Sequence, residues 1–143
     1  MSTIEKMEEL KEMAIIFFQS WGVIVRKYED QVFQFQTTCA EAKTAIDEEY
    51  SELRQTFNKA AVQVYPHMLE NNMFPGEMKP EDGMTCKDLG ELIGRNINQF
   101  HGVIVDHFGN QESAATNMLP YIFHDMKADM QAIIDTEKER VQN

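Results

Sequence analysis

The stretch MAIIFFQSWGVIV, residues Met13–Val25, decides the fold of this 143-residue chain. It lies within a run from Met1 to Tyr65 that contains no proline and a single glycine, Gly22. Proline and glycine are the residues that most disfavour a helix, so little in this run would stop one. Apolar residues recur along the run at intervals of three and four, which is the spacing of one helix face. The run therefore predicts long helices with one buried face.

The first helix is expected from about residue 3 to about residue 37. Ser2 and Glu5 have the spacing of a capping box at its start. One glycine costs only about 1 kcal/mol relative to alanine in a helix, so Gly22 leaves open whether the helix is continuous or in two pieces. Apart from a gap near Leu10, the predicted buried face consists of Ile4, Met7, Ala14, Phe17, Trp21, Ile24 or Val25, Tyr28, Val32 and Phe35.

The second helix is expected over about residues 40–65, with Thr37 or Thr38 as its N-terminal cap. Pro66 removes a backbone donor, so the helix ends there or kinks and continues to about Glu70. The segment 71–84 is rich in asparagine, glycine and proline, and these residues predict a long loop.

The third helix is expected over about residues 85–108, with its end at Gly109. The fourth is expected over about residues 112–141, unless Asn117 resets its start ahead of Pro120. The buried face predicted for the fourth helix is Leu119, Ile122, Met126, Met130, Ile133 and Val141.

Four helices with two short connections and one long one predict an all-α, antiparallel four-helix bundle in which residues 1–143 form a single domain. In such a bundle Cys39 and Cys86 lie at opposite ends, because each opens a helix that starts from a different end. A disulfide requires Cα atoms within about 7 Å. Both cysteines are therefore expected to be free thiols, unless the first helix folds back at Gly22.

The net charge of −11 argues against a nucleic-acid partner and against docking on anionic membranes, since both require basic residues. The apolar stretch 13–25 is too short to span a bilayer. The first residues lack the basic segment of a secretory signal, so a cytoplasmic protein is expected. A mature form of a secreted protein stays open as an alternative.

Residues with the chemistry of catalysis are present but do not form a recognisable set. The four histidines, His67, His101, His107 and His124, match neither a zinc signature nor a di-iron bundle pattern. Residues 77–88 resemble the loop of an EF-hand, but Lys79 stands where calcium needs an oxygen ligand. Cys86 has no base at a characteristic spacing. No metal, cofactor or enzymatic activity is expected.

Two features instead predict a binding surface. The stretch 13–25 is apolar on every side of the helix, which predicts an interface or an apolar pocket formed by Met13, Ile16, Phe17, Phe18, Trp21 and Val25. The chain also contains ten methionines, which suit adaptable apolar surfaces. Four residues in or beside the 71–84 loop form a possible lid: Met73, Phe74, Met78 and Met84.

The function that these features favour is that of a non-enzymatic, acidic helical protein acting through protein–protein interaction, most simply as a homo-oligomer. Glycines at positions 90, 94 and 102 would allow close helix–helix contact. The alternative is a carrier of a small apolar ligand, such as a fatty acid, in a cavity between the helices. Candidates to anchor a carboxylate are Arg26, Tyr28, Tyr50, Arg95 and Tyr121.

Overall fold

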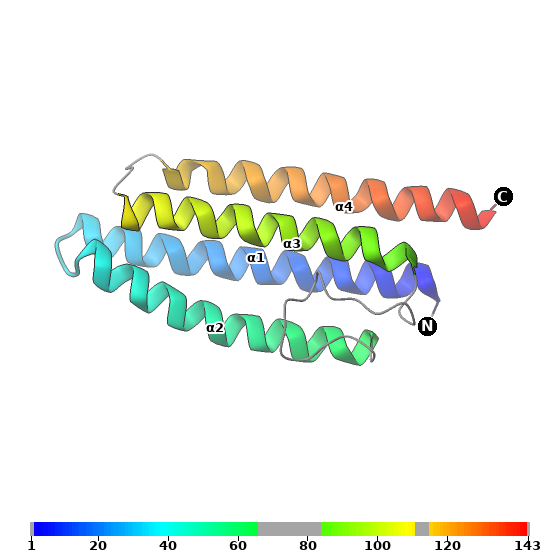
Figure 1. Ribbon diagram of the computed structural model, residues 1–143, viewed down its shortest axis with the longest axis horizontal. Coiled ribbons are helices and arrows are strands. Elements are labelled where there is room, and N and C mark those ends of the chain that lie inside the picture. Colours follow the sequence, from blue (N-terminus) through cyan, green and yellow to red (C-terminus); the bar gives the residue numbers. More distant parts are fainter. Residues whose placement is uncertain (1, 66–83, 111–114, 143) are drawn as a thin grey trace.

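The computed structural model describes residues 2–65, 84–110 and 115–142, and it confirms an all-α bundle of four long helices (Figure 1). The helices are α1 (Thr3–Phe33), α2 (Cys39–Val64), α3 (Met84–Ile104) and α4 (Leu119–Gln142). A π-helical turn, Val105–Gly109, extends α3, and a 3₁₀ turn, Ala115–Met118, precedes α4. No strand occurs among the described residues.

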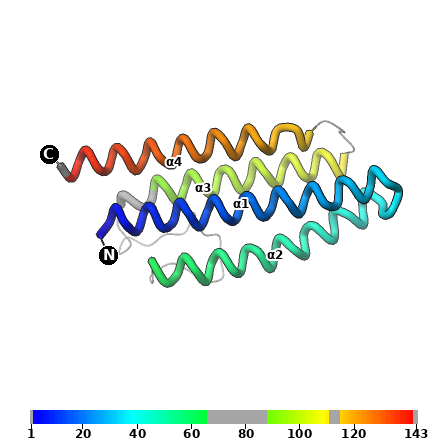
Figure 2. Tube along the Cα trace, turned by 180° about the vertical axis from the view of Figure 1, so that it is seen from behind, coloured from blue at the N-terminus to red at the C-terminus, as the bar shows by residue number. Residues whose placement is uncertain are grey.

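The helices alternate in direction along the chain (Figures 1 and 2). α1 runs from the N-terminus to the far end of the bundle, α2 returns, α3 runs parallel to α1, and α4 returns to the end where the chain began. α1 packs against both α2 and α4, and α3 packs against α4. α1 is therefore the central helix of the bundle.

The structure settles the question of Gly22, because α1 is continuous through it. The expected capping box begins the helix, with the Ser2 hydroxyl accepting from the Glu5 amide at 3.1 Å. The gap predicted near Leu10 was wrong, since that side chain is fully buried and completes the apolar face. A continuous α1 also places Cys39 and Cys86 at opposite ends of the bundle (Figure 1).

The expected end of the first helix was also wrong, since α1 stops at Phe33 and not near residue 37. The Phe35 N–H donates to the Val32 carbonyl at 3.0 Å, and the Gln36 N–H donates to the Gln31 carbonyl at 2.8 Å. These two bonds are the Schellman motif, which requires a left-handed residue after the C-cap. Phe35 takes that conformation, with φ 59°, and its side chain is 95% exposed instead of lying on the buried face.

The other boundaries follow from local chemistry. Thr38, not Thr37, caps α2 by accepting from the Glu41 amide at 3.1 Å. Gly109 ends the π-helical turn, as expected for the end of the third helix. The 3₁₀ turn before Leu119 agrees with a reset of the fourth helix near Asn117.

Val141 is exposed near the end of α4, so its assignment to the buried face was wrong. The 71–84 loop up to residue 83 and a continuation of α2 past Pro66 lie outside the described residues.

An aromatic cluster forms the centre of the core, with the fully buried Trp21 of α1 in its middle. The Trp21 ring lies 4.5 Å from that of Tyr50 on α2 and 5.0 Å from that of Phe100 on α3, measured between centroids. The Trp21 indole N–H finds no acceptor among the described residues. Packing alone therefore holds this ring in place.

Replacing Phe35 by glycine is expected to stabilise the protein, because glycine adopts the left-handed conformation without the steric cost that other residues meet there. The free energy of unfolding in urea should rise by about 1 kcal/mol, with the midpoint moving up at an unchanged slope. Phe35→Ala is the matched control, since it removes the ring but keeps the strain. An equal gain from alanine would show that the ring, and not the backbone, is the source of the cost.

Candidate functional site

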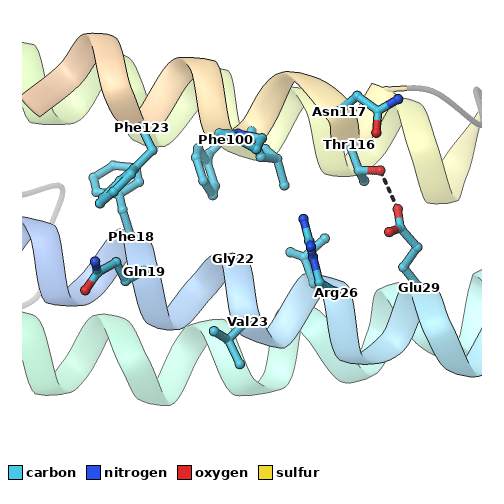
Figure 3. Close-up of a pocket in the computed structure, with 13 residues that line it drawn as sticks. Phe18, Gln19, Gly22, Val23, Arg26, Glu29, Phe100, Thr116, Asn117 and Phe123 are labelled. Atoms are coloured by element: carbon cyan, nitrogen blue, oxygen red, sulfur yellow. Dashed lines mark hydrogen bonds between the residues drawn. The ribbon is translucent and has the colours of Figure 1, made fainter.

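A cleft of about 330 Å³ opens between the C-terminal half of α1 and the start of α4 (Figure 3). Its volume lies at the lower end of the range of about 300–1,000 Å³ that is typical of small-molecule sites. The apolar lining comes from three helices and consists of Phe18, Val23, Val25, Phe100, Leu119, Pro120 and Phe123. The polar lining consists of Gln19, Arg26, Glu29, Thr116 and Asn117, with Gly22 between the two sets.

Gly22 contributes to the open space of the cleft. A Cβ atom built at this position would meet no atom within 4 Å. The adjacent position on α1 is Trp21, which fills the core between α2 and α3. At these two adjacent positions the helix thus carries a very large side chain in the core and no side chain at the cleft. The space left by the missing side chain is part of the cleft (Figure 3).

Arg26 supplies the positive charge of the cleft. It lies one turn beyond Gly22 on α1, is exposed, and points across the cleft toward α4 in Figure 3. The guanidinium forms no hydrogen bond or ion pair with the described residues. An arginine has five N–H donors in a planar fork that matches a carboxylate or phosphate. Arg26 is therefore suited to bind an anionic group at the edge of an apolar site.

Glu29 closes one end of the cleft by joining three elements. The Thr116 hydroxyl, from the 3₁₀ turn, donates a hydrogen bond to Glu29 Oε2 (Figure 3). His107 Nε2, from the π-helical turn, lies 3.4 Å from the same oxygen. The His107 side chain is mostly buried there. The Glu29 carboxylate thus already has a hydrogen-bond donor and a histidine partner within the chain. The nearby Arg26 guanidinium has no partner among the described residues.

The residues predicted as an interface or pocket are divided by the structure. Phe17, Phe18, Trp21 and Val25 are buried in the chain's own core, Met13 is half-buried, and Ile16 is 61% exposed. Phe18 and Val25 also line the cleft, whereas Met13 and Ile16 border a separate hollow among the acidic residues of α1. The possible lid residues Met73, Phe74 and Met78 lie outside the described residues. Met84 is the first residue of α3.

Of the five residues expected to anchor a carboxylate, only Arg26 lines the cleft. Tyr50 instead packs on Trp21, and its hydroxyl accepts from Arg54 Nη1 at 2.8 Å. Glu49 pairs with Lys27, and its contact with the Tyr28 hydroxyl raises the pKa of that phenol. Sequence reasoning missed Phe123 and Pro120 as cleft residues, because helical spacing does not show which groove between helices stays open.

Other kinds of site are not apparent in the described part of the chain. Among residues 2–65, 84–110 and 115–142, no group of three histidine, cysteine, aspartate or glutamate side chains gathers that could hold a metal ion. Within the same ranges, no helix is both long and apolar enough to cross a membrane. Comparison with protein-family models, with curated proteins and with solved structures finds no match. The cleft is therefore interpreted from its own geometry.

Gly22→Ala is expected to raise the free energy of unfolding by up to about 1 kcal/mol, because alanine favours the helix and its methyl group meets open space. Gly102 on α3 is the matched control, since a Cβ there also meets nothing within 4 Å and this exposed position is not among the residues that line the cleft. Equal gains for both variants in urea titrations are the expected result. A loss of stability for Gly22→Ala alone would mean that the cleft is closed in solution.

Proposed function

We propose that the protein is a non-enzymatic binding protein that carries a small apolar molecule with an acidic head group. The apolar body of the ligand occupies the cleft, and the head group binds Arg26. The observation that carries this proposal is the combination of an open, largely apolar cleft with an arginine that has no partner among the described residues. A pocket with many apolar lining groups and few polar ones is the usual form of a small-molecule site.

The arrangement of polar groups favours an anionic head over a cationic one. Glu29 is the acidic group of the cleft lining, and its Oε2 atom already accepts from Thr116 and lies beside His107. Arg26 has five N–H donors, and none of them has an acceptor among the described residues. The small volume favours a single short chain, as in a medium-chain fatty acid, over a bulky ring system.

The burial of α1 supports a ligand more strongly than it supports an interface. Within residues 13–25, the neighbouring helices bury the four side chains Phe17, Phe18, Trp21 and Val25, and they leave Ile16 and Val23 exposed. An interface between chains would have to rest on other, exposed residues. A ligand in the cleft, in contrast, would contact residues that already line an open space.

The ligand proposal can be tested with decanoic acid and decanol, which differ only in the head group. Trp21 is the single tryptophan of the chain and its ring packs on Phe18 and Phe100 of the cleft lining, so its fluorescence should report occupancy. Decanoate should bind more tightly than decanol. Arg26→Gln should weaken decanoate about tenfold, the value of one charged hydrogen bond at a partly exposed site, and leave decanol unchanged.

Filling the cleft provides the complementary test. Gly22→Leu should abolish the binding of both compounds, because its side chain would occupy the space that the ligand needs. Gly102→Leu places the same side chain on an exposed site of α3 and should bind both compounds as the unmodified protein does. Binding that survives Gly22→Leu would reject the cleft as the site. Equal affinity for decanoate and decanol would reject the role of Arg26.

Self-association is the second candidate function, and one observation favours it. Ile16 and Val23 are both strongly exposed and lie seven residues apart, so they share the outer face of α1. Sedimentation velocity at high micromolar concentration tests it directly. A dimer that Val23→Glu dissociates would support this candidate, and a monomer at every concentration would reject it.

A further inference from the structure

The turn between α1 and α2 is the most exposed apolar part of the described chain. Residues 31–38, QVFQFQTT, contain no charged side chain, and we call this segment the aromatic turn. Phe33 is 83% exposed and Phe35 is 95% exposed. In both views the turn projects past the adjacent ends of α3 and α4 (Figures 1 and 2). Both exposed side chains are therefore carried by the segment that forms this end of the bundle.

Several polar groups of the aromatic turn are hydrogen-bonded within it. The amides of Phe35 and Gln36 donate to the carbonyls of Val32 and Gln31 in the Schellman motif. The side-chain amide of Gln36 donates to that of Gln34 at 3.0 Å. Unpaired polar groups are the main cost of bringing backbone into an apolar medium. The hydrogen bonds within the turn lower the cost of bringing it into an apolar medium.

The backbone at Phe35 belongs to the same Schellman motif and is unusual for the residue that it carries. Its left-handed conformation is one that glycine adopts readily and that a bulky residue disfavours. The exposed ring makes no packing contact that would compensate, since it is almost fully solvated. A strained backbone that retains an exposed aromatic ring is an outlier of the kind found at functional surfaces.

The size of the patch identifies the kind of partner. An aromatic side chain buries about 150–250 Å² at most, so two of them fall well short of the roughly 800 Å² per partner in a stable protein interface. Reversible insertion into the interfacial region of a bilayer does not require such an area. The acids Asp30 and Glu41 flank the turn, and the chain as a whole carries a charge of −11. Anionic lipids would repel it, so the surface that fits is an uncharged, zwitterionic one.

We propose that the aromatic turn inserts Phe33 and Phe35 into the surface of a neutral phospholipid bilayer, so that the bundle docks end-on and reversibly. This docking goes beyond the ligand cleft and does not depend on it. The long axis of the bundle then stands away from the membrane, and the acidic faces of the helices remain in water.

Flotation with phosphatidylcholine vesicles tests the proposal. The unmodified protein should float with the vesicles. Phe33→Ala combined with Phe35→Gly should reduce the partition coefficient at least about tenfold, because most of the inserted apolar area is removed. Phe35→Gly relieves backbone strain, so unfolding would not explain the loss. Phe35→Trp should retain binding, since tryptophan favours the bilayer interface. Ile16→Ala removes an exposed apolar side chain from the middle of α1 and should have no effect.

The charge argument gives a second readout. Adding phosphatidylglycerol to the vesicles should weaken binding, and salt should restore it, because screening reduces repulsion between like charges. Absence of the unmodified protein from the floated vesicles would overturn the proposal, as would equal binding by the double variant. A dimer that the double variant dissociates, with no binding to vesicles, would also overturn it, because a second copy would then be the occupant.

Discussion

The position of Trp21 is the constraint on which the rest of the structure depends. Its ring is fully buried against Tyr50 of α2 and Phe100 of α3, and the neighbouring Phe17 and Phe18 extend the same cluster toward both helices. Aromatic rings bury more area than any other side chains, so displacing this cluster would cost more than displacing any other part of the core. The indole N–H has no acceptor among the described residues, so shape rather than hydrogen bonding sets the register of α1.

The cleft follows from the same constraint. With Trp21 directed into the core, the next residue of α1 faces a different direction, about 100° around the helix. That residue is Gly22, and it leaves its space empty. Phe18, one turn away on α1, and Phe100 of α3 also line the cleft. Two adjacent residues of α1 thus contribute to a packed core on one side of the helix and to an open groove on the adjacent side.

The helices could be predicted from the sequence, but the open space between them could not. Helical periodicity and the two caps at Ser2 and Thr38 are local signals, and each was confirmed. The end of α1 was missed because the Schellman motif usually carries glycine, and here it carries Phe35. Arg26 was among the expected anchors, but its selection required the position of α4 relative to α1. The width of a groove between helices depends on side chains that are far apart in the sequence. The spacing of residues along one helix gives no information on how such side chains pack together.

The distribution of charge connects the cleft with the aromatic turn. The net charge of −11 disfavours the approach of anionic molecules. At physiological salt, each exposed charge acts over a screening length of only about 8 Å. Attraction to Arg26 is therefore local, and a dilute anionic ligand gains nothing from long-range steering. An acidic apolar molecule enters a neutral bilayer through its apolar body, and this partitioning does not require attraction between charges. The cleft lies in the half of α1 that leads to the aromatic turn, so an end-on bundle would hold it near that bilayer surface.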